Sequence, residues 1–254
     1  MSVDIECSIE CRGVLCYCSN LSGKTMIFYD RVEAGYFLAR YIGDLGFVSR
    51  KTIVYGLVAG GVPVAYSLAE KTGLELDIVV VKKITYPWTT EAGFGAVAID
   101  KTCFYDRETA YGYLGLSRED LEKAIDKVHE FVVERTKRLR GSLDYSWLRG
   151  YNVIVVDDGV ATGYTMLTCI EFLRRQGAIG VYVVSPTGCT SGLELIKDHV
   201  DGLFIPNIRS PPYAVADAYM VWYDVSDEEV SGILGEASSK GFYPPKAMRE
   251  QSLQ

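Results

Sequence analysis

The sequence predicts an α/β fold built on a doubly wound, mostly parallel β-sheet. Short runs at residues 76–81, 153–156 and 181–184 are apolar apart from Asp77 and show no polar alternation, which is typical of strands covered on both faces. Helical patterns lie between these runs, and alternating strands and helices favour parallel strands joined by helical crossovers. With 254 residues, the chain is long enough for one well-buried domain with an appendage.

The other elements follow in chain order. Residues 34–45 and 62–71 fit helices, and residues 52–58 between them fit a strand. Residues 117–139 fit a long amphipathic helix that begins with a capping-box pattern, Ser-Arg-Glu-Asp. The preceding residues 84–116 hold glycine, proline and aromatic residues with little periodicity, so we expect a long, irregular excursion.

The N-terminus is rich in cysteine. Four of the seven cysteines lie close together there: Cys7, Cys11, Cys16 and Cys18. Apolar and polar residues alternate over residues 3–11, and residues 14–18 return after Arg12-Gly13, which indicates a half-buried β-hairpin. We therefore interpret these four as packing cysteines. A metal site and disulfides are the alternatives, but the spacing lacks the paired C-x2-C pattern of common zinc sites.

Composition excludes several classes of function. The formal net charge of −7 argues against broad nucleic-acid binding through phosphate neutralisation. No apolar run approaches the roughly 18 residues of a membrane-spanning helix. The first residues are acidic and lack the basic and apolar regions of a signal peptide, so we expect a cytoplasmic protein with no membrane partner.

The most informative stretch is V-I-V-V-D-D-G-V-A-T-G-Y-T-M, residues 153–166. Asp157 and Asp158 end a predicted strand, and ligands of open parallel sheets bind beyond the carboxyl ends of the strands. The glycines and threonines that follow lead into a predicted helix over residues 166–176, and such a helix N-terminus binds anions. The Walker A and dinucleotide-binding glycine patterns are both absent, which excludes those two phosphate sites.

Two carboxylates beside a phosphate loop are compatible if one ligand carries both a phosphate and hydroxyl groups, because carboxylates accept strongly from hydroxyls. A ribose 5-phosphate has both. The stretch resembles the phosphoribosyl-diphosphate signature of type I phosphoribosyltransferases, and matching segments occur in the family's order. These segments are F-Y-D-R-V-E-A-G (28–35), G-L-V-A-G-G-V-P-V-A (56–65), V-K-K…P…E…G-A (81–96) and Y-A-V…S-D-E-E-V (213–230).

The whole pattern resembles stand-alone phosphoribosyltransferase-like proteins and implies a division of the chain. We expect an N-terminal hairpin at residues 1–26, a phosphoribosyltransferase-like domain at 27–235 and a C-terminal tail at 236–254. Residues 84–116 would form a flap over the site. The region after residue 186 would form a small hood over the acceptor.

The resemblance also implies residue roles. Asp157, Asp158 and Lys83 would be catalytic, and the two aspartates would also meet a metal ion through water or the ribose hydroxyls. The expected substrate-binding residues are Gly159, Val160, Ala161, Thr162, Gly163, Tyr164, Thr165, Ala59, Gly60, Gly61, Lys82 and Tyr213. In the family, the loop at Ala59 to Gly61 binds pyrophosphate, often through a strained or cis peptide.

The hood offers three aromatic residues that either stack on the acceptor or belong to the core: Tyr213, Tyr219 and Trp222. The sequence departs from the family at Lys82, where relatives commonly have arginine, and at Ala216 and Trp222, where they commonly have glycine and phenylalanine. Trp88 stands in the flap where glycine is usual. These departures affect the acceptor pocket and the flap and leave the phosphoribosyl loop intact.

The implied activity is a Mg²⁺-dependent transfer of the 5-phosphoribosyl group from phosphoribosyl diphosphate to a purine-like or pyrimidine-like nitrogen base, with release of pyrophosphate. A homodimer is expected. Two alternatives remain open at this point. One is a non-catalytic module that senses phosphoribosyl diphosphate or a nucleotide, and the other is a hydrolase or phosphorylase of nucleoside phosphates.

Overall fold

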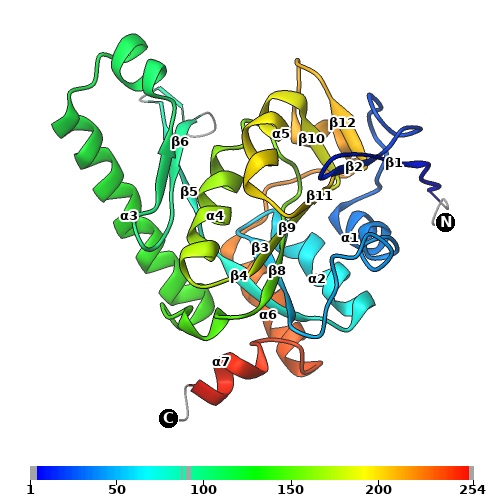
Figure 1. Cartoon of the computed structure of the whole chain (residues 1–254). Coiled ribbons are helices and arrows are strands. Elements are labelled where there is room, and N and C mark those ends of the chain that lie inside the picture. The colour runs from blue at the N-terminus through cyan, green and yellow to red at the C-terminus, as the bar shows by residue number, and fades with distance from the viewer. Residues whose placement is uncertain (1–4, 87, 90–92, 252–254) are drawn as a thin grey trace.

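The computed structural model describes residues 5–86, 88–89 and 93–251. Its central sheet has the strand order β1-β2-β11-β9-β8-β3-β4 (Figure 1). The strands are β1 (Ile9–Arg12), β2 (Leu15–Cys18), β11 (Gly202–Phe204), β9 (Gly180–Val184), β8 (Asn152–Val156), β3 (Thr52–Leu57) and β4 (Glu75–Val79). Neighbours pair in parallel from β2 to β4, and β1 is antiparallel to β2. The predicted doubly wound, mostly parallel sheet is therefore confirmed.

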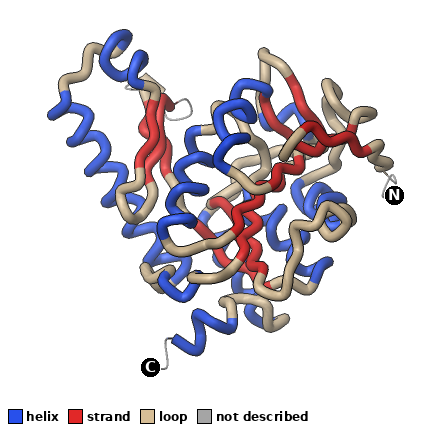
Figure 2. The backbone as a smooth tube through the Cα atoms, viewed as in Figure 1, coloured by secondary structure: helices blue, strands red, loops and turns tan. Residues whose placement is uncertain are grey.

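Helices cover both faces of this sheet, as the tube in Figure 2 shows. Val54 and Ile154 pack into the core on one face, whereas Ile53 and Val153 pack into the core on the other, because successive side chains of a strand point in opposite directions. The first face carries α1 (Arg31–Ala39), α2 (Gly61–Thr72) and α6 (Asp227–Ser239). The second carries α4 (Tyr164–Arg175) and α5 (Thr190–Ile196). Burial on both faces explains the apolar runs, and Asp77 within the first run is buried as an ion pair with Arg140.

Helix α1 starts and ends earlier than predicted. Its N-cap is Asp30, whose side chain accepts a hydrogen bond from the backbone N–H of Glu33, so the helix begins at Arg31 rather than at residue 34. The regular helix ends at Ala39, and residues up to Gly46 form turns. This shift places Arg31 in the first turn, where it points toward the end of β8.

The predicted irregular excursion is more regular than expected. Three antiparallel strands, β5 (Lys82–Thr85), β6 (Gly93–Val97) and β7 (Cys103–Tyr105), pack with α3 (Arg118–Arg140) around a small core of their own. In Figure 1 this arm stands beside the central sheet. β4 ends at Val79, so Lys82 and Lys83 belong to the first strand of the arm rather than to the sheet.

The N-terminal hairpin continues the central sheet, because β2 pairs in parallel with β11. Its cysteines form the disulfides Cys7–Cys18 and Cys11–Cys16. The disulfide alternative therefore holds for all four residues, although Cys16 and Cys18 also pack in the core as predicted. Residues of β1 are exposed, so Cys11 has no core to pack against, and the hairpin register places it directly opposite Cys16.

Two smaller units complete the fold. Strands β10 (Thr187–Cys189) and β12 (Asn207–Arg209) pair in parallel to form the predicted hood, together with the short helix η4 (Val215–Ala218). The chain ends with α7 (Lys246–Gln251), which docks Met248 against the buried Arg140 of α3. No helix in the described part of the chain is long and apolar enough to cross a membrane.

Candidate functional site

The carboxyl ends of β3 and β8, which are neighbours in the sheet, open into a cavity of about 550 Å³. This volume lies within the range of small-molecule sites. Most of the predicted site residues line it: Asp157, Asp158, Gly159, Val160, Ala161, Thr162, Gly163, Thr165, Ala59, Gly60, Lys82 and Lys83. Residues far apart in the sequence thus meet at one edge of the sheet, as the fold class predicts.

The loop after the two aspartates leads into the N-terminus of α4. Gly163 is the N-cap of α4 and has φ +87°, a conformation that favours glycine, and it makes no side-chain capping hydrogen bond. Because glycine has no side chain, Gly163 does not cap the backbone N–H groups of the first turn, which leaves a suitable site for an anion. Val160 anchors the loop, because its N–H donates to Thr187 and its carbonyl accepts from Cys189.

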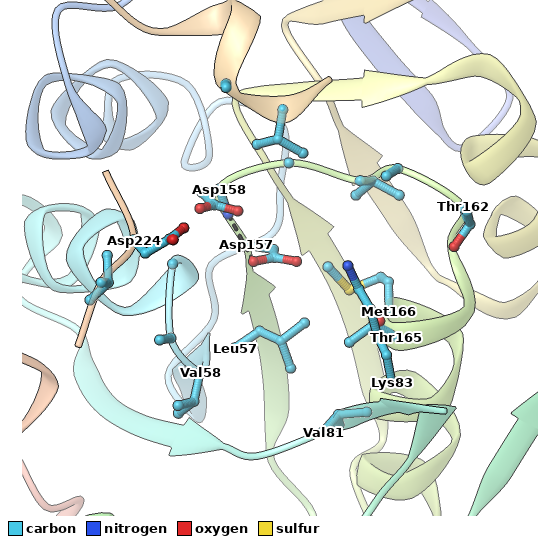
Figure 3. A pocket seen from close by; sticks show the side chains of 18 of the residues that line it. Leu57, Val58, Val81, Lys83, Asp157, Asp158, Thr162, Thr165, Met166 and Asp224 are labelled. Atoms are coloured by element: carbon cyan, nitrogen blue, oxygen red, sulfur yellow. Dashed lines mark hydrogen bonds between the residues drawn. The ribbon is translucent and has the colours of Figure 1, made fainter. Parts of the chain in front are cut away.

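Asp157 and Asp158 form a tightly held pair (Figure 3). The backbone N–H of Asp158 donates to Oδ1 of Asp157 at 2.9 Å. Burial raises the pKa of Asp157 well above its ordinary value, and the neighbouring charge of Asp158 raises it further. Burial also raises the pKa of Asp158, whereas the guanidinium of Arg31 opposes that rise. The pair is thus a half-buried acidic centre with the Arg31 guanidinium beside Asp158.

The loop after β3 approaches this pair closely. The peptide between Val58 and Ala59 is cis, in agreement with the expectation from the family. A Cβ atom on Gly60 would lie 1.9 Å from Oδ2 of Asp158, and one on Gly61 would lie 2.5 Å from the carbonyl oxygen of Val156. Glycine is therefore required at position 61, where a Cβ would meet backbone, whereas a Cβ at position 60 would displace the Asp158 carboxylate.

Basic side chains reach the cavity from the arm. Lys83 rises from β5 toward Asp157 and Thr165 in Figure 3, and its charge lowers the pKa of Asp157 against the effect of burial. Lys82 lies over the ring of Phe131, with Nζ 5.3 Å from the ring centroid, and Arg135 of α3 flanks the same ring at 5.8 Å. The described lining holds four basic and three acidic side chains, although the whole chain carries −7. The local balance therefore suits an anionic ligand.

Three predicted binding residues do not line the cavity: Gly61, Tyr164 and Tyr213. Gly61 and Tyr164 begin α2 and α4, directly after the two loops. Tyr213 lies behind the phosphate-type loop, since a Cβ on Gly159 would be 3.0 Å from its hydroxyl oxygen. Burial raises the pKa of Tyr213, which keeps its hydroxyl protonated.

Of the other two aromatic candidates in the hood, only Trp222 lines the cavity. Tyr219 is buried, and its hydroxyl donates to the backbone oxygen of Asp158 at 2.6 Å. Trp222 stacks on Arg31, whose guanidinium carbon lies 3.9 Å from the ring centroid. Sequence reasoning did not single out Arg31, although it lies inside the quoted F-Y-D-R segment. Arg135 and Asp224 also line the cavity without having been assigned.

These features define the class of protein: an α/β protein with a phosphate-type loop and a diacid at one edge of a parallel sheet. Comparison with known proteins gives the family. Residues 37–208 match the family model described as phosphoribosyl transferase domain. The chain belongs to this family, and the resemblance to type I phosphoribosyltransferases is thereby confirmed.

Individual relatives agree with this assignment. A Mycobacterium tuberculosis protein, whose name gives the family and no substrate, is 30% identical over 213 residues, 83% of this chain and 47% of that protein. A solved structure from Thermus thermophilus is 30% identical with a TM-score of 0.66, covering 83% of this chain and 99% of that one. A Pyrococcus furiosus ribose-phosphate pyrophosphokinase is 29% identical over 139 residues, 54% of this chain and 47% of that enzyme. The chain spans about half the length of the curated relatives it matches.

Proposed function

We propose that the chain transfers the 5-phosphoribosyl group of phosphoribosyl diphosphate to a nitrogen base and releases pyrophosphate. The observation that carries this proposal is the shared cavity: the diacid of β8, the loop before α4 and the loop at Ala59 and Gly60 all line it. A sugar phosphate with a diphosphate at C1 needs these three groups at once, namely hydroxyl acceptors and two sets of anion-binding N–H groups.

In this proposal, the 5-phosphate binds the backbone N–H groups and threonine hydroxyls at 159–165, and Asp157 and Asp158 accept hydrogen bonds from the ribose hydroxyls. The pyrophosphate binds the loop at 59–61 and Lys83, with Lys82 at its outer side. These cations would stabilise the charge that develops on the leaving pyrophosphate. The protein then acts mainly by positioning and by electrostatic stabilisation, which explains why no histidine is needed in the cavity.

The donor set fits Mg²⁺ delivered with the substrate. Within the described residues, no group of three or more His, Cys, Asp or Glu side chains forms a metal site made by protein alone. Mg²⁺ commonly keeps several waters and uses one or two carboxylates together with substrate phosphates. Asp157 and Asp158 would hold it, directly or through water or the ribose hydroxyls. When bound, the ion supplies charge neutralisation on the diphosphate.

The acceptor base would lie under the hood, where Ala214, Val215, Ala216 and Trp222 line the cavity. This wall is largely apolar and carries one aromatic ring, which suits a flat heterocycle. Asp224 also faces the cavity in Figure 3, on the side of Asp158. It could accept a hydrogen bond from an N–H group of the base.

The test is incubation with phosphoribosyl diphosphate, Mg²⁺ and a panel of purine, pyrimidine and related bases. Pyrophosphate release and new phosphoribosylated products are followed by mass spectrometry. We expect release that depends on one class of base and is abolished by EDTA. Binding of phosphoribosyl diphosphate without turnover on any base would favour the sensing module, and release of ribose phosphate from a nucleotide would favour the hydrolase.

A further inference from the structure

Arg31 occupies a position where a charge is disfavoured for two reasons. It is only 5% exposed, and burial of a guanidinium costs free energy unless it is well paired. It is also the first residue of α1, where the positive end of the helix dipole favours acidic rather than basic side chains. The stability of α1 therefore does not explain why an arginine stands at this position. The explanation lies in the contacts of its side chain.

Those contacts join two walls of the cavity. Nε of Arg31 donates to Oδ2 of Asp158 at 2.9 Å, and Nη1 donates to the backbone oxygen of Tyr223, also at 2.9 Å. The flat face of the guanidinium stacks on Trp222 at 3.9 Å. One side chain thus connects the acid at the end of β8 with the hood segment that lines the acceptor side.

The carboxylate of Asp158 has little freedom once Arg31 is in place. The backbone of Asp158 is fixed on both sides, because its oxygen accepts from Tyr219 and its N–H donates to Asp157. Oδ2 of the same residue lies against Gly60. Arg31 adds a charged hydrogen bond to Oδ2 and thereby sets the direction of the carboxylate. Without it, the side chain could rotate toward the open cavity, where Asp158 is 13% exposed.

We propose that Arg31 is a positioning residue that holds the Asp158 carboxylate for the ribose hydroxyls and couples its orientation to Trp222 and Tyr223. This inference rests on the proposed function, because it takes those hydroxyls as the partners of Asp158. It has a specific consequence: a change at Trp222, on the acceptor wall, alters the affinity for phosphoribosyl diphosphate, and it does so through Arg31.

Arginine suits this role better than lysine. Its planar fork donates to Asp158 and to the Tyr223 carbonyl at the same time, while its face remains available for stacking on Trp222. A lysine could pair with Asp158 but could not make all three contacts. Arg31→Lys should therefore retain only part of the effect.

The test is a double-mutant cycle measured by calorimetric titration in the presence of Mg²⁺. The proteins are the wild type, Arg31→Met, Trp222→Ala, the double variant and the control Arg174→Gln, which removes an Arg–Asp pair outside the cavity. Each is titrated with phosphoribosyl diphosphate in that buffer and, separately, with pyrophosphate in a buffer that contains EDTA in place of Mg²⁺. Pyrophosphate lacks the ribose hydroxyls, and without Mg²⁺ no metal ion links it to the two acids. Circular dichroism checks that each variant folds.

We expect Arg31→Met to weaken phosphoribosyl-diphosphate binding about 10- to 100-fold, as for loss of a charged hydrogen bond, and pyrophosphate binding by less than about threefold. Trp222→Ala should weaken phosphoribosyl-diphosphate binding about 3- to 10-fold in the wild type and not further in Arg31→Met. If Arg31→Met does not fold, Arg31→Lys takes its place, with an intermediate loss expected.

Additive effects of the two substitutions would overturn the inference, as would equal losses for both ligands, which would indicate a general structural role. Unchanged affinity in Arg31→Met would also overturn it. These outcomes differ from a failure of the proposed function, which would appear as a wild type that does not bind phosphoribosyl diphosphate, and the inference would then fail with it.

Discussion

The close approach of Gly60 to Asp158 provides a steric test of the site. Cβ of an alanine at position 60 would lie 1.9 Å from Oδ2 of Asp158, whereas real Cβ atoms essentially never approach another heavy atom closer than 3.0 Å. The carboxylate must therefore move by about 1 Å, a displacement large enough to impair a binding site. The backbone itself accepts alanine, because Gly60 has φ −61° and ψ −29°. Gly60→Ala thus displaces one carboxylate and leaves the backbone unstrained.

The size of the effect follows from the contacts that are lost. A carboxylate displaced by about 1 Å loses its favourable geometry toward the ribose hydroxyls, and a hydrogen bond to a charged group contributes about 1.5–3 kcal/mol. The affinity for phosphoribosyl diphosphate should therefore fall about 10- to 100-fold. The free energy of unfolding should fall by about 1.5–3 kcal/mol, because the displaced Oδ2 also accepts the hydrogen bond from Nε of Arg31.

The assay is calorimetric titration of Gly60→Ala with phosphoribosyl diphosphate and Mg²⁺, together with chemical denaturation. Gly232→Ala in α6 is the matched control, because a Cβ there meets no atom within 4 Å. The control should bind as the wild type does. Wild-type affinity in Gly60→Ala would refute the reasoning, because it would mean that the position of the Asp158 carboxylate does not matter for the ligand.

Three further outcomes are expected. Arg140→Met should lower the free energy of unfolding by about 3–5 kcal/mol, because it leaves Asp77, fully buried like Arg140, without its ion-pair partner; an unchanged denaturation midpoint would contradict this. In denaturant without reductant, a thiol reagent should modify three cysteines, Cys103, Cys169 and Cys189, and after reduction it should modify all seven. Seven reactive thiols before reduction would exclude the two hairpin disulfides. Lys83→Ala should weaken pyrophosphate binding about 10-fold or more, whereas Lys71→Ala on the exposed side of α2 should not; equal behaviour of the two variants would remove Lys83 from the pyrophosphate site.

The central sheet could be predicted because its strands are covered on both faces. The run Val153 to Val156 is apolar at every position since one set of side chains meets α1 and α2 and the other meets α4. The arm could not be predicted in the same way. Its strands are short and antiparallel, and residues such as Phe94 and Leu121 find their partners in distant segments, so no local period marks them.

For the N-terminal hairpin, the strands were predicted but the bonding of their cysteines was not. Its alternating pattern correctly indicates strands, but alternation alone does not say whether a second layer covers them. Here β2 packs in the core, whereas β1 is exposed and is held to β2 by a disulfide. Cysteine spacing left that choice open. The register of the two strands pairs Cys11 with Cys16, but it does not pair Cys7 with Cys18, which depends on the course of the chain before β1.

Within the site, the diacid and the phosphate-type loop were predictable because they are contiguous in the sequence. Arg31 was not, because its partner Asp158 lies 127 residues later. One local signal was present: an arginine at the start of a helix, directly after the N-cap Asp30, where acidic residues are favoured. A basic residue in such a position indicates a specific partner elsewhere in the chain.

The most direct test of the account is the affinity of Asp157→Asn/Asp158→Asn for phosphoribosyl diphosphate in the presence of Mg²⁺. The two amides keep the shape of the carboxylates and remove their charge, so the loop before α4 should still fold and should still bind inorganic phosphate. The account predicts that phosphoribosyl-diphosphate binding is lost in this variant while folding, followed by circular dichroism, is retained. Unchanged affinity would contradict the assignment of the two aspartates to the ribose.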